Sequence, residues 1–207
     1  MRRFAPVTSV CTLLLFATLS HAQQVDLAVG GGITLAPKST SSSEAALPPT
    51  EKGGIYPSIG VDVLLNNGFA VKHRLGLNVE TSWRYKRGSY DGYEKYRPIF
   101  TDVNALFQPK LSKKFGLDFL AGAGVASNQF YLPGMTSCVS APGTCYTTSN
   151  HFMEHLSGGL RYYVWHRLPH VFIRPEIHYY HIQNNFEFYS GNLLRASASI
   201  GYTFGDH

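Results

Sequence analysis

Apolar and polar residues alternate strictly along 192–204, which reads NLLRASASIGYTF. The even positions, from Leu194 to Phe204, are all apolar or aromatic, whereas the odd positions, from Arg195 to Thr203, are polar or small. Successive side chains of a β-strand point to opposite faces, so a period of two indicates a strand with one apolar face and one polar face.

The same alternation occurs in earlier segments, so the chain is predicted to form eight strands: 25–35, 55–65, 71–85, 99–111, 115–129, 152–164, 171–181 and 192–204. Each segment is long enough for a tilted strand to cross a bilayer, which takes about 9–11 residues. We expect long loops at 37–52, 86–97, 132–150 and 182–191, and tight turns at 66–68, 112–114 and 166–170. Proline removes a ladder donor, so Pro109 and Pro175 are expected to mark a bulge or a strand end.

Residues 1–22 have the layout of a secretory signal peptide. Arg2 and Arg3 precede a short apolar run at 10–19, and Ser-His-Ala at 20–22 forms a small-x-small cleavage site. The run is too short to span a membrane as a helix. We therefore expect an exported chain whose mature domain covers 23–207, with no later segment suited to a membrane helix.

Charge and cysteine content narrow the possible partners. Removing Arg2 and Arg3 lowers the formal net charge from +5 to +3, and no Lys/Arg run suggests nucleic-acid binding. Cys138 and Cys145 lie close together in one predicted loop. In an exported protein such a pair is expected to form a disulfide. The alternative, a metal pair, lacks further ligands at suitable spacing, so neither a metal nor another cofactor is expected.

The two faces of the predicted strands differ in chemistry. The polar faces carry many glycines and charges of both signs, which suits the tight interior of a small barrel. The apolar faces carry almost no charge and end in aromatic residues: Trp83, Tyr85, Tyr162, Tyr179, Tyr202 and Phe204. Aromatic girdles around an apolar belt are typical of membrane barrels. We therefore expect the apolar faces to contact lipid. The alternative is a soluble barrel of the lipocalin kind, with the apolar faces inside.

The terminal strand, with Gly201 before the alternating aromatics Tyr202 and Phe204, resembles the last strand of bacterial outer-membrane β-barrels. As a pattern of eight strands, the chain resembles the small barrels of the OmpA-like superfamily. The resemblance implies an all-β fold, an eight-stranded antiparallel up-and-down transmembrane β-barrel in the cell outer membrane. It also implies contact with outer-membrane lipid and lipopolysaccharide, and recognition of the C-terminal strand by the barrel-assembly machinery. Residues 205–207 depart from the family, which usually ends at the Phe.

An eight-stranded barrel is only wide enough for its own side chains to fill it. Buried charges need partners, so we expect the polar-face acids and bases, in near balance, to form a salt-bridged plug. The predicted lumen network is Asp62, Glu80, Arg84, Asp102, Lys110, Asp118, Arg161, Arg174, Glu176 and Arg195. A charged lumen could also serve as a small-solute channel, which remains an alternative.

His155-Leu156-Ser157 is the stretch that most suggests catalysis. The lipid A deacylase family of outer-membrane barrels carries a His-x-Ser pair with a later Glu, and Glu176 lies downstream on a predicted strand. The His would act as base on the Ser hydroxyl, with the carboxylate orienting the His. However, the register turns His155 and Ser157 towards the lumen, whereas such an enzyme presents its triad to lipid.

The sequence thus favours a non-enzymatic barrel with a structural or surface-interaction role, which displays its loops outside the cell. The alternatives are a lipid A-modifying hydrolase and a small-solute channel. The external ligand is not identified by any residue pattern.

Overall fold

The computed structural model describes residues 22–35, 53–65, 73–90, 94–112, 114–131, 146–165, 168–183 and 191–205. These residues form β1 (Ala22–Leu35), β2 (Ile55–Leu65), β3 (His73–Trp83), β4 (Gly88–Tyr90), β5 (Glu94–Pro109), β6 (Phe115–Tyr131), β7 (Tyr146–Trp165), β8 (Leu168–Ile182) and β9 (Asn192–Gly205). No helix among them is long and apolar enough to cross a membrane.

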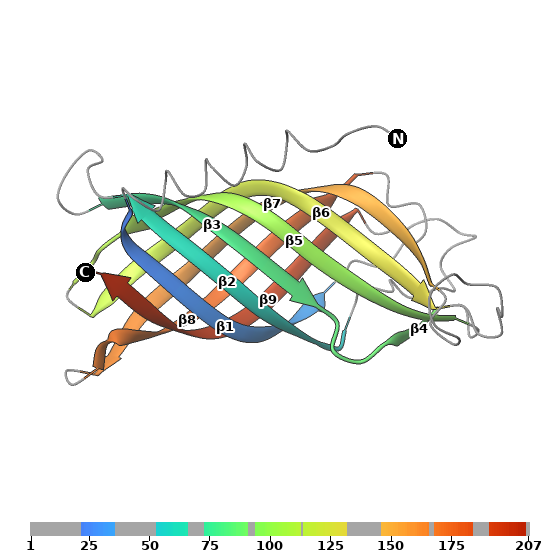
Figure 1. The fold of residues 1–207 in the computed structure, drawn as a ribbon, viewed down its shortest axis with the longest axis horizontal. Helices are drawn as coiled ribbons and strands as arrows, with labels where there is room; N and C mark the ends of the chain where they lie inside the picture. Colours follow the sequence, from blue (N-terminus) through green and yellow to red (C-terminus); the bar gives the residue numbers. More distant parts are fainter. Residues whose placement is uncertain are drawn as a thin grey trace, which may run out of the picture.

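The strands other than β4 form a closed antiparallel barrel of eight strands (Figure 1). Each strand pairs with its neighbours in the order β1–β2–β3–β5–β6–β7–β8–β9. The ring closes where β9 pairs with β1, from Gln24 opposite Gly205 to Leu35 opposite Leu194. Closure gives each of these eight strands two neighbours, which is the condition for a sheet to lie in lipid. The predicted eight-stranded antiparallel up-and-down barrel is therefore confirmed.

The two ends of the barrel differ. One end, called here the turn end, carries the start of β1, the end of β9 and the short connections after β2, β5 and β7. At this end Ser112 Oγ accepts hydrogen bonds from the backbone N–H groups of Lys114 and Phe115, which stabilises a tight turn. The opposite end, called the loop end, carries β4 (Figure 1) and the strand ends that are separated by the longer stretches of sequence.

Three strands continue further towards the loop end than the sequence predicted. β5 begins at Glu94 and β7 at Tyr146, although both residues fall in predicted loops. Residues Gly88–Tyr90 form β4, which pairs with the start of β5, so the predicted loop 86–97 is wrong in this part. β5, β6 and β7 have 16, 17 and 20 residues, more than the roughly 9–11 that cross a bilayer. The three strands therefore extend beyond the apolar belt at the loop end.

Burial alternates along every barrel strand, in the phase that the sequence predicted. The large apolar side chains of the predicted apolar faces point outwards and form a continuous belt, with Val29 at 56% exposed and Ile177 at 64%. Between them the polar residues point into the lumen. An apolar surface of this extent on the outside of a closed barrel is suited to lipid rather than to water.

The two prolines differ in their effects. Pro109 is the last residue of β5, as expected. Pro175 lies in the middle of β8 and stays in register with Ala198 of β9. On its other side, the ladder between β7 and β8 is interrupted between the pairs Gly159–Glu176 and Tyr162–Ile173. Pro175 thus interrupts the β7–β8 ladder locally without shifting the register, so the expectation that it marks a bulge or a strand end is wrong.

Three further predictions fall outside the described residues. They are most of the signal peptide, the turn at 66–68, and the disulfide between Cys138 and Cys145. They remain predictions.

Candidate functional site

The lumen is filled with charged side chains. Six carboxyl groups and three guanidinium groups, each less than 5% exposed, point into it: Asp26, Asp62, Glu80, Asp102, Asp118, Glu176, Arg161, Arg174 and Arg195. They come from β1, β2, β3, β5, β6, β7, β8 and β9, so the charges bridge opposite walls of the barrel. Such deeply buried groups are stable only when they are paired.

Arg161 of β7 is the centre of the half of the network nearer the turn end. Its Nε donates to Asp118 Oδ2 at 3.0 Å, and one Nη donates to Asp62 Oδ2 at 2.7 Å. The other Nη donates to Asp26. The guanidinium also lies 4.1 Å from the ring centroid of Phe172, on whose face it stacks. One side chain thus connects β7 to β1, β2 and β6.

Arg174 of β8 extends this cluster along the lumen. It donates to Asp62 Oδ2 at 2.6 Å, and its Nε lies 3.0 Å from Glu176 Oε2. Asp62 therefore accepts from both arginines, and also from the side-chain amide of Asn78 at 2.7 Å. Because each charge has several partners, the cluster acts as one unit rather than as separate pairs.

A second cluster surrounds Arg195 of β9, nearer the loop end. Arg195 donates to Glu80 and to the hydroxyl of Ser82, both on β3. The same guanidinium lies 3.1 Å from Nε2 of His178. Arg195 therefore links the closing strand β9 to the opposite wall of the barrel.

The candidate catalytic residues His155, Ser157 and Glu176 lie in the lumen, not on the outer wall. His155 Nδ1 donates to the amide oxygen of Asn104 at 2.8 Å, and its Nε2 lies 3.0 Å from Nδ1 of His178. Glu176 contacts Arg174. The two ring nitrogens of His155 are thus engaged by groups other than Ser157, and the arrangement is that of a structural network.

Apolar layers close the lumen above and below the charges. Towards the loop end, Phe100 stacks between Tyr56 and Tyr180, with ring centroids 5.8 and 5.4 Å apart. The rest of this layer comprises Ala126, Met153, Ile182 and Leu193. Towards the turn end, a second layer is formed by Leu64, Leu106 and Leu120. The described part of the lumen is therefore a plug of charges between two apolar layers.

Two residues of the predicted network lie at the rims instead. Arg84 follows the end of β3, where it donates to the hydroxyl of Tyr96. Lys110 lies just beyond β5, half-buried at an isolated bridge to Gly116. Burial, together with the charges of Arg74 and Arg161, lowers the pKa of Lys110 below its ordinary value.

This rim placement changes the charge count of the interior. The sequence predicted near balance, with Arg84 and Lys110 among the bases. In the structure Asp26 joins the acids, so six buried carboxyl groups face three buried guanidinium groups. The described part of the lumen thus holds three more buried carboxyl groups than buried guanidinium groups.

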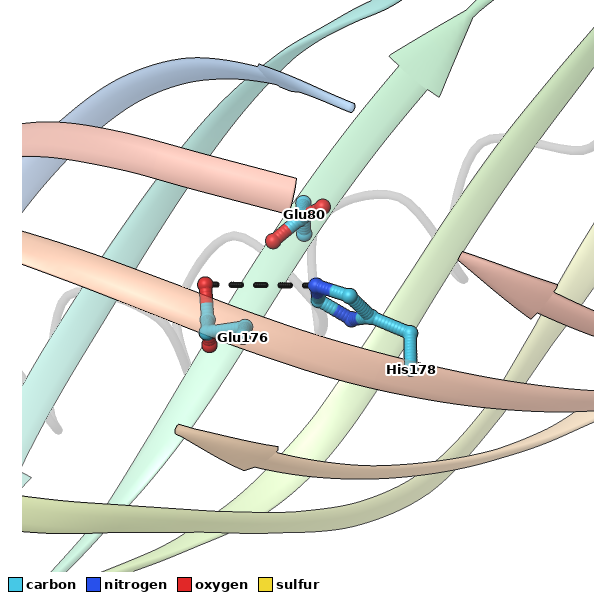
Figure 2. A group of neighbouring side chains, drawn as sticks. All are labelled: Glu80, Glu176 and His178. Atoms are coloured by element: carbon cyan, nitrogen blue, oxygen red, sulfur yellow. Dashed lines mark ion pairs between the residues drawn. The ribbon is translucent and has the colours of Figure 1, made fainter. Parts of the chain in front are cut away.

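One group of described residues has ligand atoms close enough to hold a metal ion. Atoms of Glu80, Glu176 and His178 lie within 4.8 Å of one another, and Figure 2 shows the three side chains converging in the lumen. Glu176 Oε2 is 3.9 Å from His178 Nε2. Glu80 and Glu176 are already paired with Arg195 and Arg174, whose positive charges would repel a cation. The group is better described as part of the network.

Four residues that hydrogen-bond within the network are missing from the predicted set: Gln24, Asn78, Asn104 and His178. Each occupies an inward position, so the alternation of inward and outward residues was enough to include them. The same alternation also indicates the apolar layers, since Tyr56 and Leu64 are apolar residues at inward positions of β2.

Comparison with known proteins identifies the fold. No protein-family model and no curated protein sequence matches the chain. Among solved structures, Ail, the attachment invasion locus protein of Yersinia pestis, has a TM-score of 0.55 at 12% identity, covering 88% of this chain and 99% of Ail. Neisserial surface protein A has a TM-score of 0.53 at 13% identity, covering 87% of this chain and 96% of that protein.

The chain has the fold of the small eight-stranded outer-membrane β-barrels. A further structure of Ail, in complex with the heparin analogue sucrose octasulfate, has a TM-score of 0.56 at 12% identity, over 87% of this chain and 98% of Ail. At this identity the likeness concerns the fold, and the function has to be argued from the side chains of this barrel.

Proposed function

We propose that the protein is an outer-membrane barrel with a closed lumen, and that its role is surface interaction at the loop end. The observation that carries the closed lumen is its filling: charges bridge the walls at mid-height, and apolar layers lie on both sides of them. The apolar outer belt and the fold of the structural neighbours support the membrane location. The N-terminal sequence pattern supports export.

A closed plug predicts the absence of ion conduction. Purified barrel reconstituted into planar bilayers is expected to give no single-channel steps, because displacing the plug means separating buried ion pairs. The variant Arg161→Met tests whether weakening the plug changes this. Reproducible conductance steps from the wild-type protein would contradict the proposal and favour the small-solute channel.

Basic side chains gather at the loop end, beside the short strand β4. The basic rim consists of Arg84, Lys86, Arg87, Lys95 and Arg97. Counting Asp91 and Glu94, segment 84–97 has five basic and two acidic residues, a net charge of +3. Arg84 stacks on Tyr96 at 5.2 Å and Arg87 on Tyr131 at 3.5 Å from the ring centroids. These contacts hold the guanidinium groups at the rim.

A rim of this kind is suited to an anionic partner, such as a sulfated or phosphorylated polysaccharide outside the cell. Positive charges raise the association rate and make binding sensitive to salt. The complex of Ail with a heparin analogue is consistent with anion binding on this fold. For this chain, the basic rim itself is the supporting observation.

Heparin affinity chromatography of the detergent-solubilised barrel tests the surface role. The triple variant Lys86→Gln, Arg87→Gln and Lys95→Gln is expected to elute at clearly lower salt than the wild type. The matched control is Lys114→Gln, which removes an exposed charge at the turn end. Equal elution of the triple variant and the wild type would reject the basic rim as the binding surface, without affecting the barrel proposal.

A further inference from the structure

A carboxylate faces outwards within the apolar belt. Glu154 lies on β7 between Phe152 and Leu156, which are 50% and 56% exposed on the same outer face. Of the seven carboxyl groups whose side chains the structure describes, Glu154 is the one on the outer wall; the other six lie in the lumen. An ionisable group on the lipid-facing side of a barrel is costly, more so with depth, and therefore indicates a function.

The neighbours of Glu154 towards β8 and β9 are polar. Gln183 Nε2 donates to Glu154 Oε1 at 3.2 Å, and His181 lies directly opposite Glu154 in the register. Asn192 Oδ1 accepts from His181 Nδ1 at 2.9 Å and from the hydroxyl of Tyr179 at 2.7 Å. No cation lies within ion-pair distance of Glu154 among the described residues. Glu154, Tyr179, His181, Gln183 and Asn192 are called the outer polar cluster.

An apolar groove lies next to this cluster, on the side nearer the turn end. Its volume is about 740 Å³. Small residues, Ala105, Ala121 and Gly158, form its floor, and larger side chains line its walls: Leu75, Phe107, Phe119, Leu156, Ile177 and Tyr179. Phe107 and Phe119 stack with ring centroids 6.4 Å apart along one side. The volume is within the range of sites that hold a single small ligand.

Two residues join the groove to the outer polar cluster. Tyr179 lines the groove with its ring, while its hydroxyl donates to Asn192. Leu156, also in the groove, precedes Gly158 and follows Glu154 on the same outer face of β7. Because β8 runs towards the loop end, the polar groups lie on the loop-end side of the apolar floor. Along the barrel axis, the combined surface is therefore polar on its loop-end side and apolar on its turn-end side.

We propose that this surface binds one membrane phospholipid with a primary-amine headgroup, its acyl chain in the groove and its ammonium against Glu154. An amine is the headgroup that complements a carboxylate with no cationic partner among the described residues, since ion pairing is stronger near lipid than in water. An anionic headgroup would instead be repelled. The proposal rests on the membrane insertion proposed above.

Native mass spectrometry of the detergent-solubilised barrel tests this proposal. Phosphatidylethanolamine and phosphatidylcholine with identical acyl chains are added at equal concentration, and the lipid-bound fractions are compared. Both are zwitterionic, but only the ethanolamine offers N–H donors. We expect the wild type to retain phosphatidylethanolamine about fivefold better, the factor that corresponds to about 1 kcal/mol. Glu154→Gln is expected to remove the preference while leaving retention of phosphatidylcholine unchanged.

Variants that fill the groove test the acyl-chain part. A Cβ added at Gly158 would meet nothing within 4 Å, so Gly158→Leu has an unobstructed position from which to extend into the groove. It is expected to reduce retention of both lipids, whereas Ala198→Leu, on the outer face of β9 and away from the groove, is expected to leave it unchanged. If Gly158→Leu fails to fold, Ala121→Leu fills the groove from β6 instead.

Three results would overturn the site. They are equal retention of the two lipids by the wild type, a preference that survives in Glu154→Gln, and retention of phosphatidylglycerol as strong as that of phosphatidylethanolamine. The mobility of each unheated variant in SDS gels reports barrel folding separately. Failure of membrane insertion is thereby distinguished from failure of lipid binding.

Discussion

Replacing Arg161 by methionine removes the centre of the lumen plug while keeping most of the side-chain volume. The wild-type guanidinium donates to Asp26, Asp62 and Asp118 and is fully buried. In the variant, Asp62 and Asp118 keep Arg174 as a partner, since one Nη of Arg174 lies 2.6 Å from Asp62 Oδ2 and 3.6 Å from Asp118 Oδ2. Asp26 loses its ion pair to Arg161 altogether.

The expected effect on stability follows from this geometry. Breaking a buried ion pair by removing one partner costs about 3–5 kcal/mol, because the other charge stays buried without compensation. Arg161 has three such partners, but the network shares them and the costs are not additive. We therefore expect Arg161→Met to lower the free energy of unfolding by about 3–5 kcal/mol.

Equilibrium unfolding in urea, with the barrel inserted in lipid vesicles and the folded fraction read from unheated gels, measures this change. The double variant Arg161→Met, Asp118→Leu is expected to recover part of the loss, because it removes one of the unpaired carboxylates. A loss below about 1 kcal/mol for the single variant would refute the reasoning, since that is the range of exposed, hydrated ion pairs.

The remaining prediction compares two glycines of the barrel wall, one in close contact with a neighbouring strand and one in open space. Gly124→Ala is expected to cost about 1–3 kcal/mol, since its Cβ would lie 2.7 Å from Asp102 Cα, while Gly158→Ala, in open space, is expected to change stability by less than about 0.5 kcal/mol. Equal urea midpoints for the two variants would contradict this comparison.

The period of two predicted the barrel because it records which side of the wall each residue occupies. Leu194, Ile200 and Phe204 are exposed outwards, and Arg195 and Thr203 are buried in the lumen, as their parity required. Lipid outside and a filled interior impose opposite chemistry on alternate residues, so the pattern is strong throughout the membrane-spanning part of each strand.

Beyond the membrane this constraint ends, and so does the pattern. The first residues of β7, from Tyr146, pair with β6 without an apolar side to mark them. The same holds for β4, which is held by pairing with Glu94–Tyr96 of β5. Extensions of this kind depend on cross-strand partners distant in the chain, which alternation within one strand does not encode.

The composition of the lumen network was predicted only in part. The odd or even position of a residue in its strand shows which face of the strand the side chain is on, but not its position along the barrel axis. Arg84 and Lys110 have the right parity but lie at opposite rims. Asp26 has the same parity and lies deep enough to contact Arg161. The height of a side chain depends on strand tilt and stagger around the ring, which are properties of the closed barrel.

Insertion into the outer membrane as a closed barrel is tested by the gel mobility of the membrane-fraction protein. Samples are run in SDS with and without boiling, after the outer-membrane fraction has been separated. We expect the protein in this fraction and a shift of its band on boiling, because closure and the bridged lumen resist SDS until heated. A soluble protein whose band does not shift would contradict membrane insertion and would place the apolar face in a closed interior.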